Sequence, residues 1–226
     1  MSARLPAALA TLGLCVALLA AWPGIARAAP GAGQADFAAR PASDEARRLA
    51  DWVVATDDTH GLPFVIVDKR AATVFAFDQR GSLVGAAPAL LGLAQGDDTA
   101  PGIGGRRLAD IGRAQRITPA GRFEASLGRN LAGKGILWVD YDSAISLHAV
   151  VTANAAERRL QRLATPSALD NRISYGCINV PAAYYDRVIQ PLFTPADGIV
   201  YILPESRPFS DLFALRPAEQ AAPQGD

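Results

Sequence analysis

The first regular pattern along the chain is helical. Ser43 offers an N-cap, and Asp44 and Glu45 follow it, where the helix dipole favours negative charge. Apolar residues then recur at the spacing of one helical face, namely Ala46, Leu49, Ala50, Val53 and Val54. This spacing predicts an amphipathic helix that packs on the outside of the domain and stops at Gly61.

From Leu62 onward the hydrophobic pattern changes to that of β-strands. Short runs rich in β-branched and aromatic residues alternate with turn-forming segments. The predicted strands are 64–67, 73–77, 83–93, 121–127, 135–141, 144–150 and 198–203. Two further helices are predicted, at 153–163 and at 181–193, the second with Pro181 in its first turn and Asn179 near enough to cap it. The chain is therefore predicted to be a mainly β domain with a few peripheral helices.

Three segments show neither the helical nor the strand spacing of apolar residues. Residues 29–42 contain little that packs and predict a flexible leader, and residues 206–226 predict a tail. Residues 95–116 form a long connection rich in Gly and charge. Because connections of this length are usually functional or mobile, this one is either a substrate lid or a plain surface insertion.

The N-terminus has the pattern of an export signal. Arg4 supplies a positive charge, residues 9–22 are almost uninterruptedly apolar, and Ala26 and Ala28 are small residues where signal peptidase requires them. The apolar stretch is short for a membrane span. We therefore expect cleavage near Ala28, a periplasmic mature protein and no stable membrane span after cleavage, with an uncleaved anchor as the alternative.

Cleavage also changes the charge balance and the cysteine content. Removing Arg4 and Arg27 with the signal leaves 20 basic beside 22 acidic residues, which argues against nucleic acid or an anionic membrane surface as partner. Cys15 is lost as well; Leu14 stands where a lipoprotein box needs a small residue, so lipid attachment is not expected. Cys177 is then the only thiol.

A lone cysteine in an oxidising compartment has three explanations. It is buried and inert, paired with another molecule, or kept for its reactivity. One cysteine and two histidines supply too few ligands for a metal site without carboxylates, so we expect no metal and no cofactor.

The residues suited to chemistry lie between 146 and 181. His148 ends a predicted strand, and Cys177 needs such a base or imidazolium partner to remain a thiolate. Gly176 permits a tight turn whose amides face a developing oxyanion, and a helix beginning just after Cys177 would favour the thiolate further. Arg172 is suited either to a substrate carboxylate or to a surface ion pair.

The run Ser174-Tyr175-Gly176-Cys177-Ile178-Asn179, after an upstream His, resembles the signature of the L,D-transpeptidase catalytic domain, also called the YkuD domain. Residues 65–77 resemble the opening hairpin of that family, and residues 118–123 resemble its Thr-Pro-X-Gly-X-Phe element. The resemblance covers about 62–204. It implies a β-sandwich or barrel-like catalytic domain at 62–205, after a signal peptide at 1–28 and a leader with one helix at 29–61.

The resemblance also implies a role for individual residues. Cys177 is the nucleophile and His148 is its general base, which the backbone carbonyl of Ala149 orients. The remaining roles are oxyanion donation by the backbone amides of Tyr175, Gly176 and Cys177, and shaping of the site by hydrogen bonds from Ser174 and Asn179. Two departures from the family stand out: Tyr175 replaces a common His, and the gap 149–173 is longer than usual.

The implied activity is acyl transfer on peptidoglycan stem peptides. The Cys177 thiolate attacks the carbonyl between the third and fourth residues of a tetrapeptide, D-alanine leaves, and an amine resolves the thioester. In similar enzymes the acceptor is a second stem peptide, a lipoprotein or a free D-amino acid. The alternatives are a hydrolase on the same scaffold and a non-catalytic cell-wall-binding domain; a papain-like peptidase has the opposite order of Cys and His.

Overall fold

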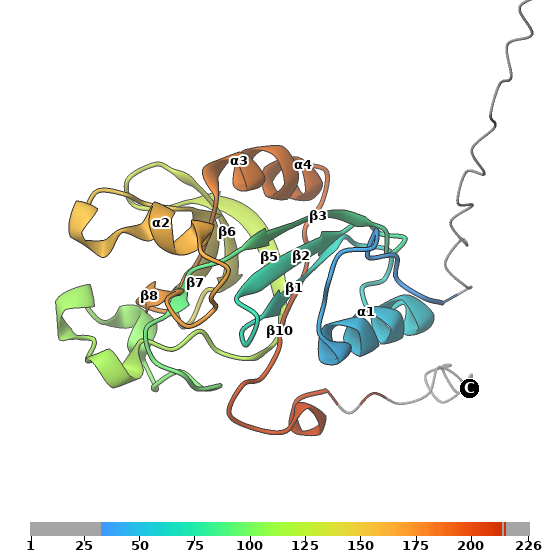
Figure 1. Ribbon diagram of the computed structural model, residues 1–226, viewed down its shortest axis with the longest axis horizontal. Helices are drawn as coiled ribbons and strands as arrows, with labels where there is room; N and C mark the ends of the chain where they lie inside the picture. The colour runs from blue at the N-terminus through green and yellow to red at the C-terminus, as the bar shows by residue number, and fades with distance from the viewer. Residues whose placement is uncertain (1–32, 214, 216–226) are drawn as a thin grey trace, which may run out of the picture.

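The computed structural model describes residues 33–213 and 215 of the chain. Its main element is an eight-stranded sheet of order β3-β2-β1-β10-β5-β6-β7-β9 (Figure 1). The strands are β1 (Phe64–Asp68), β2 (Thr73–Phe77), β3 (Leu83–Pro88), β5 (Gly121–Arg129), β6 (Gly135–Asp140), β7 (Ile145–Ala149), β9 (Ile178–Val180) and β10 (Gly198–Ile202). The mainly β fold predicted from the sequence is confirmed. The expected signal peptide lies outside the described residues.

The sheet is nearly closed upon itself. Strands β1 and β10 pair in parallel, as do β7 and β9, and the other neighbours are antiparallel. A short parallel pair, β4 (Leu91–Gly92) with β8 (Arg172–Ser174), forms a second sheet. Leu90 and Asn179 exchange backbone hydrogen bonds of 2.8 and 2.9 Å, which tie β9 to the segment that follows β3.

Strand β1 separates two hydrophobic clusters. Val65 and Val67 point into the cluster inside the curved sheet, whereas Phe64 and Ile66 point into the cluster beneath the first helix. This alternation follows from the two-residue period of a strand. Because both faces are covered, every residue of β1 is buried, and each large side chain contributes about 1.5–3 kcal/mol to folding.

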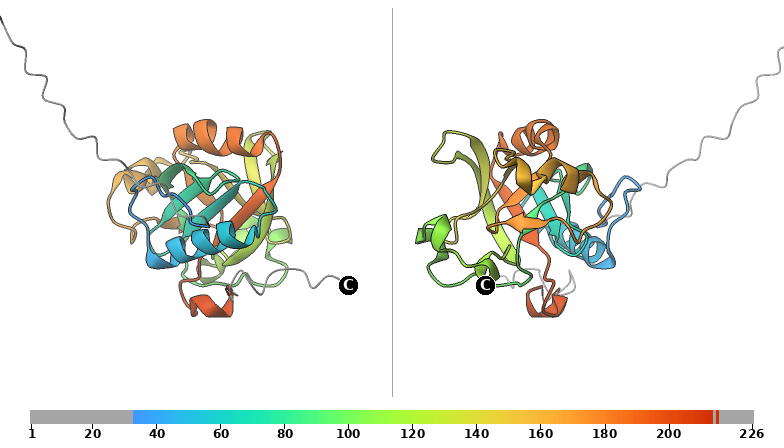
Figure 2. Two further views of the ribbon diagram at one scale, coloured as in Figure 1. Left: turned by 90° about the vertical axis from the view of Figure 1, so that its right-hand side faces the viewer. Right: turned by 60° about the vertical axis from the view of Figure 1, so that its left-hand side comes forward.

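Helix α1 (Asp44–Thr56) covers the outer face of this strand region. Ser43 Oγ accepts a hydrogen bond of 3.1 Å from the Ala46 amide, so the predicted N-cap is confirmed. The helix ends at Thr56, where Asp57 adopts a left-handed conformation with φ of 50°. The predicted stop at Gly61 is therefore wrong by several residues. Figure 2 shows from two further sides that α1 and the helical segment after β9 lie on different sides of the sheet.

The two later helices differ from their predictions. Residues 153–163 do not form one helix, because Arg158 has a φ of 50° and separates a 3₁₀ turn (Ala155–Glu157) from α2 (Arg159–Ala164). The segment predicted at 181–193 is helical, as α3 (Ala182–Tyr184), a π-helical turn (Tyr185–Ile189) and α4 (Gln190–Phe193).

The start of that segment corrects two expectations about the site. Cys177 is followed by strand β9 and not by a helix, so no helix N-terminus stabilises its thiolate. Asn179 lies inside β9 and does not cap α3, whose N-cap position is Pro181 without a side-chain hydrogen bond.

The described parts of the expected leader and tail pack against the core. Phe37 is only 4% exposed, and its ring meets Phe75 and Phe77 edge-on at 5.4 and 5.0 Å between centroids. Phe213 is buried beside Tyr201, with 6.3 Å between the two ring centroids. The long connection 95–116 contains three 3₁₀ turns. Among the described residues, no helix is long and apolar enough to span a membrane.

Candidate active site

Strands β7 and β9 bring Cys177 and His148 together. The strands are parallel, with Leu147 opposite Ile178 and His148 opposite Asn179. Leu147 and Ile178 belong to the core cluster, so His148 and Asn179 face the other side of the sheet. Cys177 lies two residues before Asn179 and therefore shares the face of His148.

The imidazole of His148 is oriented by the carbonyl of the next residue. His148 Nδ1 lies 2.8 Å from Ala149 O, where it donates a hydrogen bond, and this leaves Nε2 for Cys177. Burial lowers the pKa of His148, but the hydrogen bonds with Cys177 and Ala149 and the charge of Cys177 outweigh burial. The pKa of His148 is therefore raised above its ordinary value.

The thiol of Cys177 is half-buried and has polar neighbours. Ser146 Oγ donates to Cys177 Sγ at 3.6 Å, and the thiol is within 3.6 Å of Ala144 O. Burial raises the pKa of Cys177, whereas the hydrogen bond and charge of His148 and the hydrogen bonds from Ser146 lower it. The net pKa lies below that of an ordinary thiol, as a cysteine nucleophile requires.

The turn before Cys177 requires glycine and is held from beneath by a threonine. Gly176 has a φ of 130°, and a Cβ there would lie 2.7 Å from Ile117 O. Thr118 Oγ1 donates to Gly176 O at 2.7 Å and accepts from the Gly92 amide at 2.8 Å. Thr118, the first residue of the Thr-Pro-X-Gly-X-Phe element, is thus fully buried beneath the turn.

Two side chains fix the carbonyl of Cys177. Ser174 Oγ donates to Cys177 O at 2.6 Å, and Asn179 Nδ2 donates to the same oxygen at 3.2 Å. Ser174 Oγ also accepts from the Gly176 amide at 3.1 Å. Because the Gly176 amide has this partner, the amides of Tyr175 and Cys177 are the better placed of the three expected oxyanion donors.

The long connection 95–116 reaches the site at its last residue. The guanidinium of Arg116 lies over the ring of Tyr175, 3.9 Å from the centroid, and Arg116 Nε donates to Ile111 O at 3.2 Å. Such a stacked cation stabilises the ring position. The end of the connection therefore fixes the ring of Tyr175.

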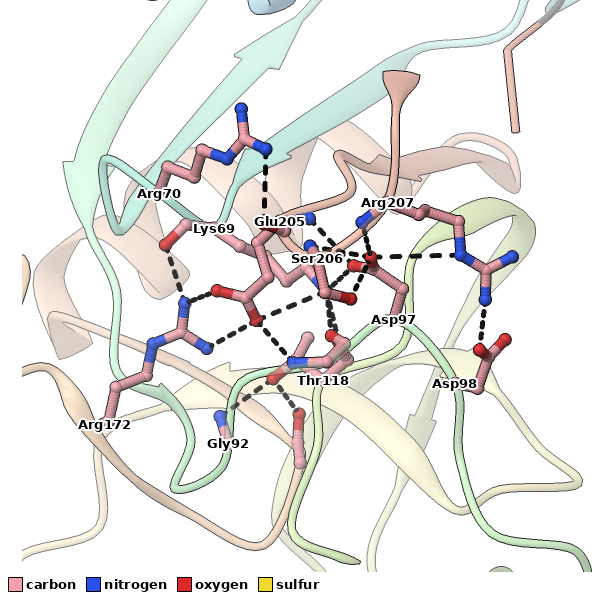
Figure 3. A network of polar contacts seen from close by, with 12 residues as sticks. Lys69, Arg70, Gly92, Asp97, Asp98, Thr118, Arg172, Glu205, Ser206 and Arg207 are labelled. Atoms are coloured by element: carbon pink, nitrogen blue, oxygen red, sulfur yellow. Dashed lines mark hydrogen bonds and ion pairs between the residues drawn. The ribbon is translucent and has the colours of Figure 1, made fainter. Parts of the chain in front are cut away.

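A buried lysine supports Thr118 (Figure 3). Lys69 Nζ donates to Gly96 O at 2.5 Å, to Asp97 Oδ1 at 2.8 Å and to Thr118 O at 2.9 Å. Glu205 Oε1 lies 3.6 Å from the same nitrogen. Burial lowers the pKa of Lys69, although Asp97 and Glu205 act in the opposite direction.

Asp97 joins this lysine to the end of the described chain. Its Oδ1 accepts from the Glu205 amide at 2.8 Å, and its Oδ2 accepts from the amides of Ser206 and Arg207, each at 2.9 Å. Burial raises the pKa of Asp97, but the hydrogen bonds from Lys69, Ser206 and Glu205 lower it far below its usual range. The carboxylate is therefore ionised in the folded protein.

Arg172 belongs to the same network. Its guanidinium pairs with the Glu205 carboxylate and donates to Lys69 O at 3.0 Å (Figure 3). Of the two roles left open by the sequence, the structure supports the ion pair. The pair is largely buried, not on the surface as expected.

A cavity of about 420 Å³ lies beside the imidazole. His148, Lys134, Val151, Tyr185 and Asp186 are among the residues that line it. It lies between the start of β6, the end of β7 and the π-helical turn, and Cys177 is not among its lining residues. In the described part of the chain, no group of three or more His, Cys, Asp or Glu residues is placed to hold a metal ion.

Sequence reasoning missed three residues of this site. Ser146 was detectable, because the strand period places it on the face of His148. Thr118 lay in a recognised motif, but its contact with the Gly176 turn spans 58 residues. Arg159 donates to Asn179 Oδ1 at 2.7 Å from α2, and no local pattern signals this contact.

Comparisons with known proteins find similarity only at the level of structure. No family model matches the chain, and the search of curated proteins found no match. An L,D-transpeptidase from Xylanimonas cellulosilytica is 15% identical, with 63% of this chain and 60% of that chain covered and a TM-score of 0.38. The Campylobacter jejuni helical cell shape determining protein Pgp2 is also 15% identical, over 67% of this chain and 49% of that chain, with a TM-score of 0.41.

The catalytic domain of an E. faecium L,D-transpeptidase is 17% identical. The match covers 63% of this chain and 98% of that domain, with a TM-score of 0.34. The chain thus spans three fifths or less of the first two structures and almost all of the isolated E. faecium domain. These values are too low to transfer an activity from those proteins to this chain. The function has to be argued from the site itself.

Proposed function

We propose that this protein is an L,D-transpeptidase that acts on peptidoglycan stem peptides after export from the cytoplasm. The observation that carries the proposal is that β7 and β9 put His148, oriented by Ala149 O, on the face of Cys177, where it lowers the pKa of the thiol. Cys177 lies in the Ser-X-Gly-Cys run that resembles the family signature, and His148 lies upstream of it, as in that signature. The signal-like N-terminus supports the proposed location, where peptidoglycan is found.

In the first step the thiolate acts as nucleophile. Cys177 Sγ attacks the carbonyl between the third and fourth residues of a tetrapeptide stem, and amides of the Tyr175–Cys177 turn stabilise the oxyanion. The tetrahedral intermediate collapses to a thioester as the C–N bond breaks. The His148 imidazolium gives its Nε2 proton to the leaving D-alanine amine.

In the second step His148 acts as base. An acceptor amine loses a proton to Nε2 as it attacks the thioester carbonyl, and the Cys177 thiolate leaves. We place the acceptor in the cavity beside His148, because the amine must come within hydrogen-bond reach of the base. A second stem peptide, a lipoprotein amine or a free D-amino acid are the candidate acceptors.

Product analysis tests this proposal. The purified mature protein is incubated with a disaccharide tetrapeptide, with and without a D-amino acid, and the products are separated by mass spectrometry. Exchange of the terminal D-alanine for the added amino acid, or formation of a crosslinked dimer, supports transpeptidation. Release of D-alanine without exchange supports the hydrolase on the same scaffold.

The control is the Cys177→Ala variant, which lacks the thiol and leaves the rest of the chain unchanged. It should form neither product. Exchange or crosslinking by this variant would contradict the proposal, since no thioester can form.

A further inference from the structure

The stretch between the two catalytic residues supplies a cation to the site. Helix α2 lies between β7 and β8, and its first residue, Arg159, is only 13% exposed at its side chain. Arg159 Nη1 donates to Asn179 Oδ1 at 2.7 Å, and its Nε pairs with Glu157. Arg159 is thus held between the 3₁₀ turn before α2 and strand β9.

The contact continues to the nucleophile. Asn179 accepts from Arg159 through Oδ1 and donates from Nδ2 to Cys177 O at 3.2 Å. An amide side chain has its oxygen and nitrogen at fixed positions, so fixing one fixes the other. The guanidinium therefore helps to set the orientation of the Asn179 amide and, through it, the Cys177 carbonyl.

The same charge acts on the base. His148 and Asn179 are paired across β7 and β9, so the group bound to Asn179 lies near the imidazole. The positive charge of Arg159 lowers the pKa of His148, against the raising effect of Cys177 and Ala149. Like charges disfavour each other when they are partly withdrawn from water.

We propose that Arg159 is a positioning residue for the Cys177–His148 pair, which it acts on through Asn179 and through its charge. This inference rests on the proposed function only in taking that pair as the catalytic one. It assigns a purpose to the long stretch between β7 and β8, which would otherwise be a surface insertion.

The charge effect is measured by NMR on the whole mature protein. The chain has two histidines, so a ¹³C-labelled imidazole spectrum contains two signals, and the His148→Gln variant identifies which belongs to His148. In Arg159→Gln the midpoint of the His148 titration should move to higher pH, because a repelling cation is gone. Arg159→Lys, which keeps the charge, should titrate like the parent.

The positioning effect is measured by the rate at which a carbapenem acylates Cys177. Each variant is compared at the pH where its own acylation rate is highest. Loss of a charge-assisted hydrogen bond should slow Arg159→Gln by about 10-fold. Arg159→Lys should recover only part of this loss, because an ammonium lacks the planar fork that bridges Glu157 and Asn179. Should Arg159→Gln fail to fold, Arg159→Met, which retains an apolar stem, takes its place.

The matched control is Arg158→Gln, which removes an equal charge from the adjacent, exposed residue. It should change neither the His148 titration nor the acylation rate. An unchanged His148 midpoint in Arg159→Gln, or an equal shift in Arg158→Gln, overturns the inference. A shift specific to Arg159→Gln in a protein that forms no transpeptidation product would support the inference while the proposed function fails.

Discussion

At Cys177 two opposing effects decide the protonation state of the thiol. Burial disfavours the thiolate, whereas the hydrogen bond and charge of His148 favour it and are strong enough to lower the pKa. His148 lowers the pKa of Cys177, and Cys177 raises the pKa of His148. The chemistry of the site therefore depends on both residues together.

This balance predicts the pH dependence of thiol alkylation. An ordinary thiol has a pKa of about 8.5. Because the pKa of Cys177 is lowered, the rate of its alkylation by iodoacetamide should rise with a midpoint below that pH. In His148→Gln the stabilising partner is lost and burial remains, so the midpoint should move to higher pH. Alkylation quenched at fixed times over a range of pH, followed by mass spectrometry, measures the midpoint of each protein. Identical midpoints in the two proteins would count against the pairing.

Thr118 supports the turn before Cys177 through two buried hydrogen bonds. Replacing it by Val removes the donor to Gly176 O and the acceptor for the Gly92 amide. Each buried group left without a partner costs about 1–3 kcal/mol, so the Thr118→Val protein should be less stable and slower in acylation. Urea denaturation and acylation kinetics measure the two effects. Thr118→Ser, which keeps the hydroxyl, should resemble the parent in both measurements. Parent-like stability and acylation in Thr118→Val would contradict the role of the hydroxyl.

The sequence singled out Cys177 and His148 but not most of the residues that support them. The Gly-Cys run and the upstream His have fixed spacing within short segments, so they were recognisable. The supports from Thr118, Lys69 and Arg159 act across long separations that only the folded chain brings close.

At the scale of the element, α1 is a helix whose start is defined by one cap. Ser43 Oγ satisfies the Ala46 amide, which otherwise has no partner within the helix. Ser43→Ala should lower the free energy of unfolding by about 1 kcal/mol, measured by urea denaturation. Ser43→Asp should retain the cap. Neither variant should change Cys177 acylation, because α1 packs over β1 and β2, whereas Cys177 precedes β9 at the far end of the strand order; a change would contradict this arrangement.

Strand and helix predictions differed in accuracy for physical reasons. The strands 64–67 and 73–77 were predicted nearly to the residue, because both have dense β-branched and aromatic runs between clear turns. The helix 153–163 was overextended, because the positive φ of Arg158 has no sequence signal. Strand β9 was read as the approach to a helix, because three residues are too few for a visible period.

At the scale of the whole molecule, Asp97 and Lys69 join distant segments. They connect the β1–β2 turn, the start of the long connection, the Thr118 support and residues 205–207 (Figure 3). This network does not include Cys177 or His148, but through Thr118 it supports the turn before Cys177.

Asp97→Asn should therefore destabilise the whole fold. It removes the carboxylate nearest to the buried Lys69 ammonium, and Glu205 at 3.6 Å compensates only in part, so the loss should be about 3 kcal/mol at neutral pH. The pKa of Asp97 is depressed in the folded state, so its contribution is complete above its unfolded value, near pH 4, and is lost as the pH falls further. Urea denaturation at pH 7 and pH 3 should show a smaller difference between variant and parent at the lower pH. An equal difference at both would contradict the role of the carboxylate charge.

The central claim is that Cys177 is an activated acyl-accepting nucleophile. Intact-mass spectrometry of the mature protein after exposure to a carbapenem tests it most directly, since the strained lactam carbonyl acylates such a thiolate. We predict one stoichiometric adduct on the parent and none on Cys177→Ala. No adduct on the parent, together with slow alkylation of its thiol by iodoacetamide, would contradict the claim and favour a non-catalytic wall-binding domain.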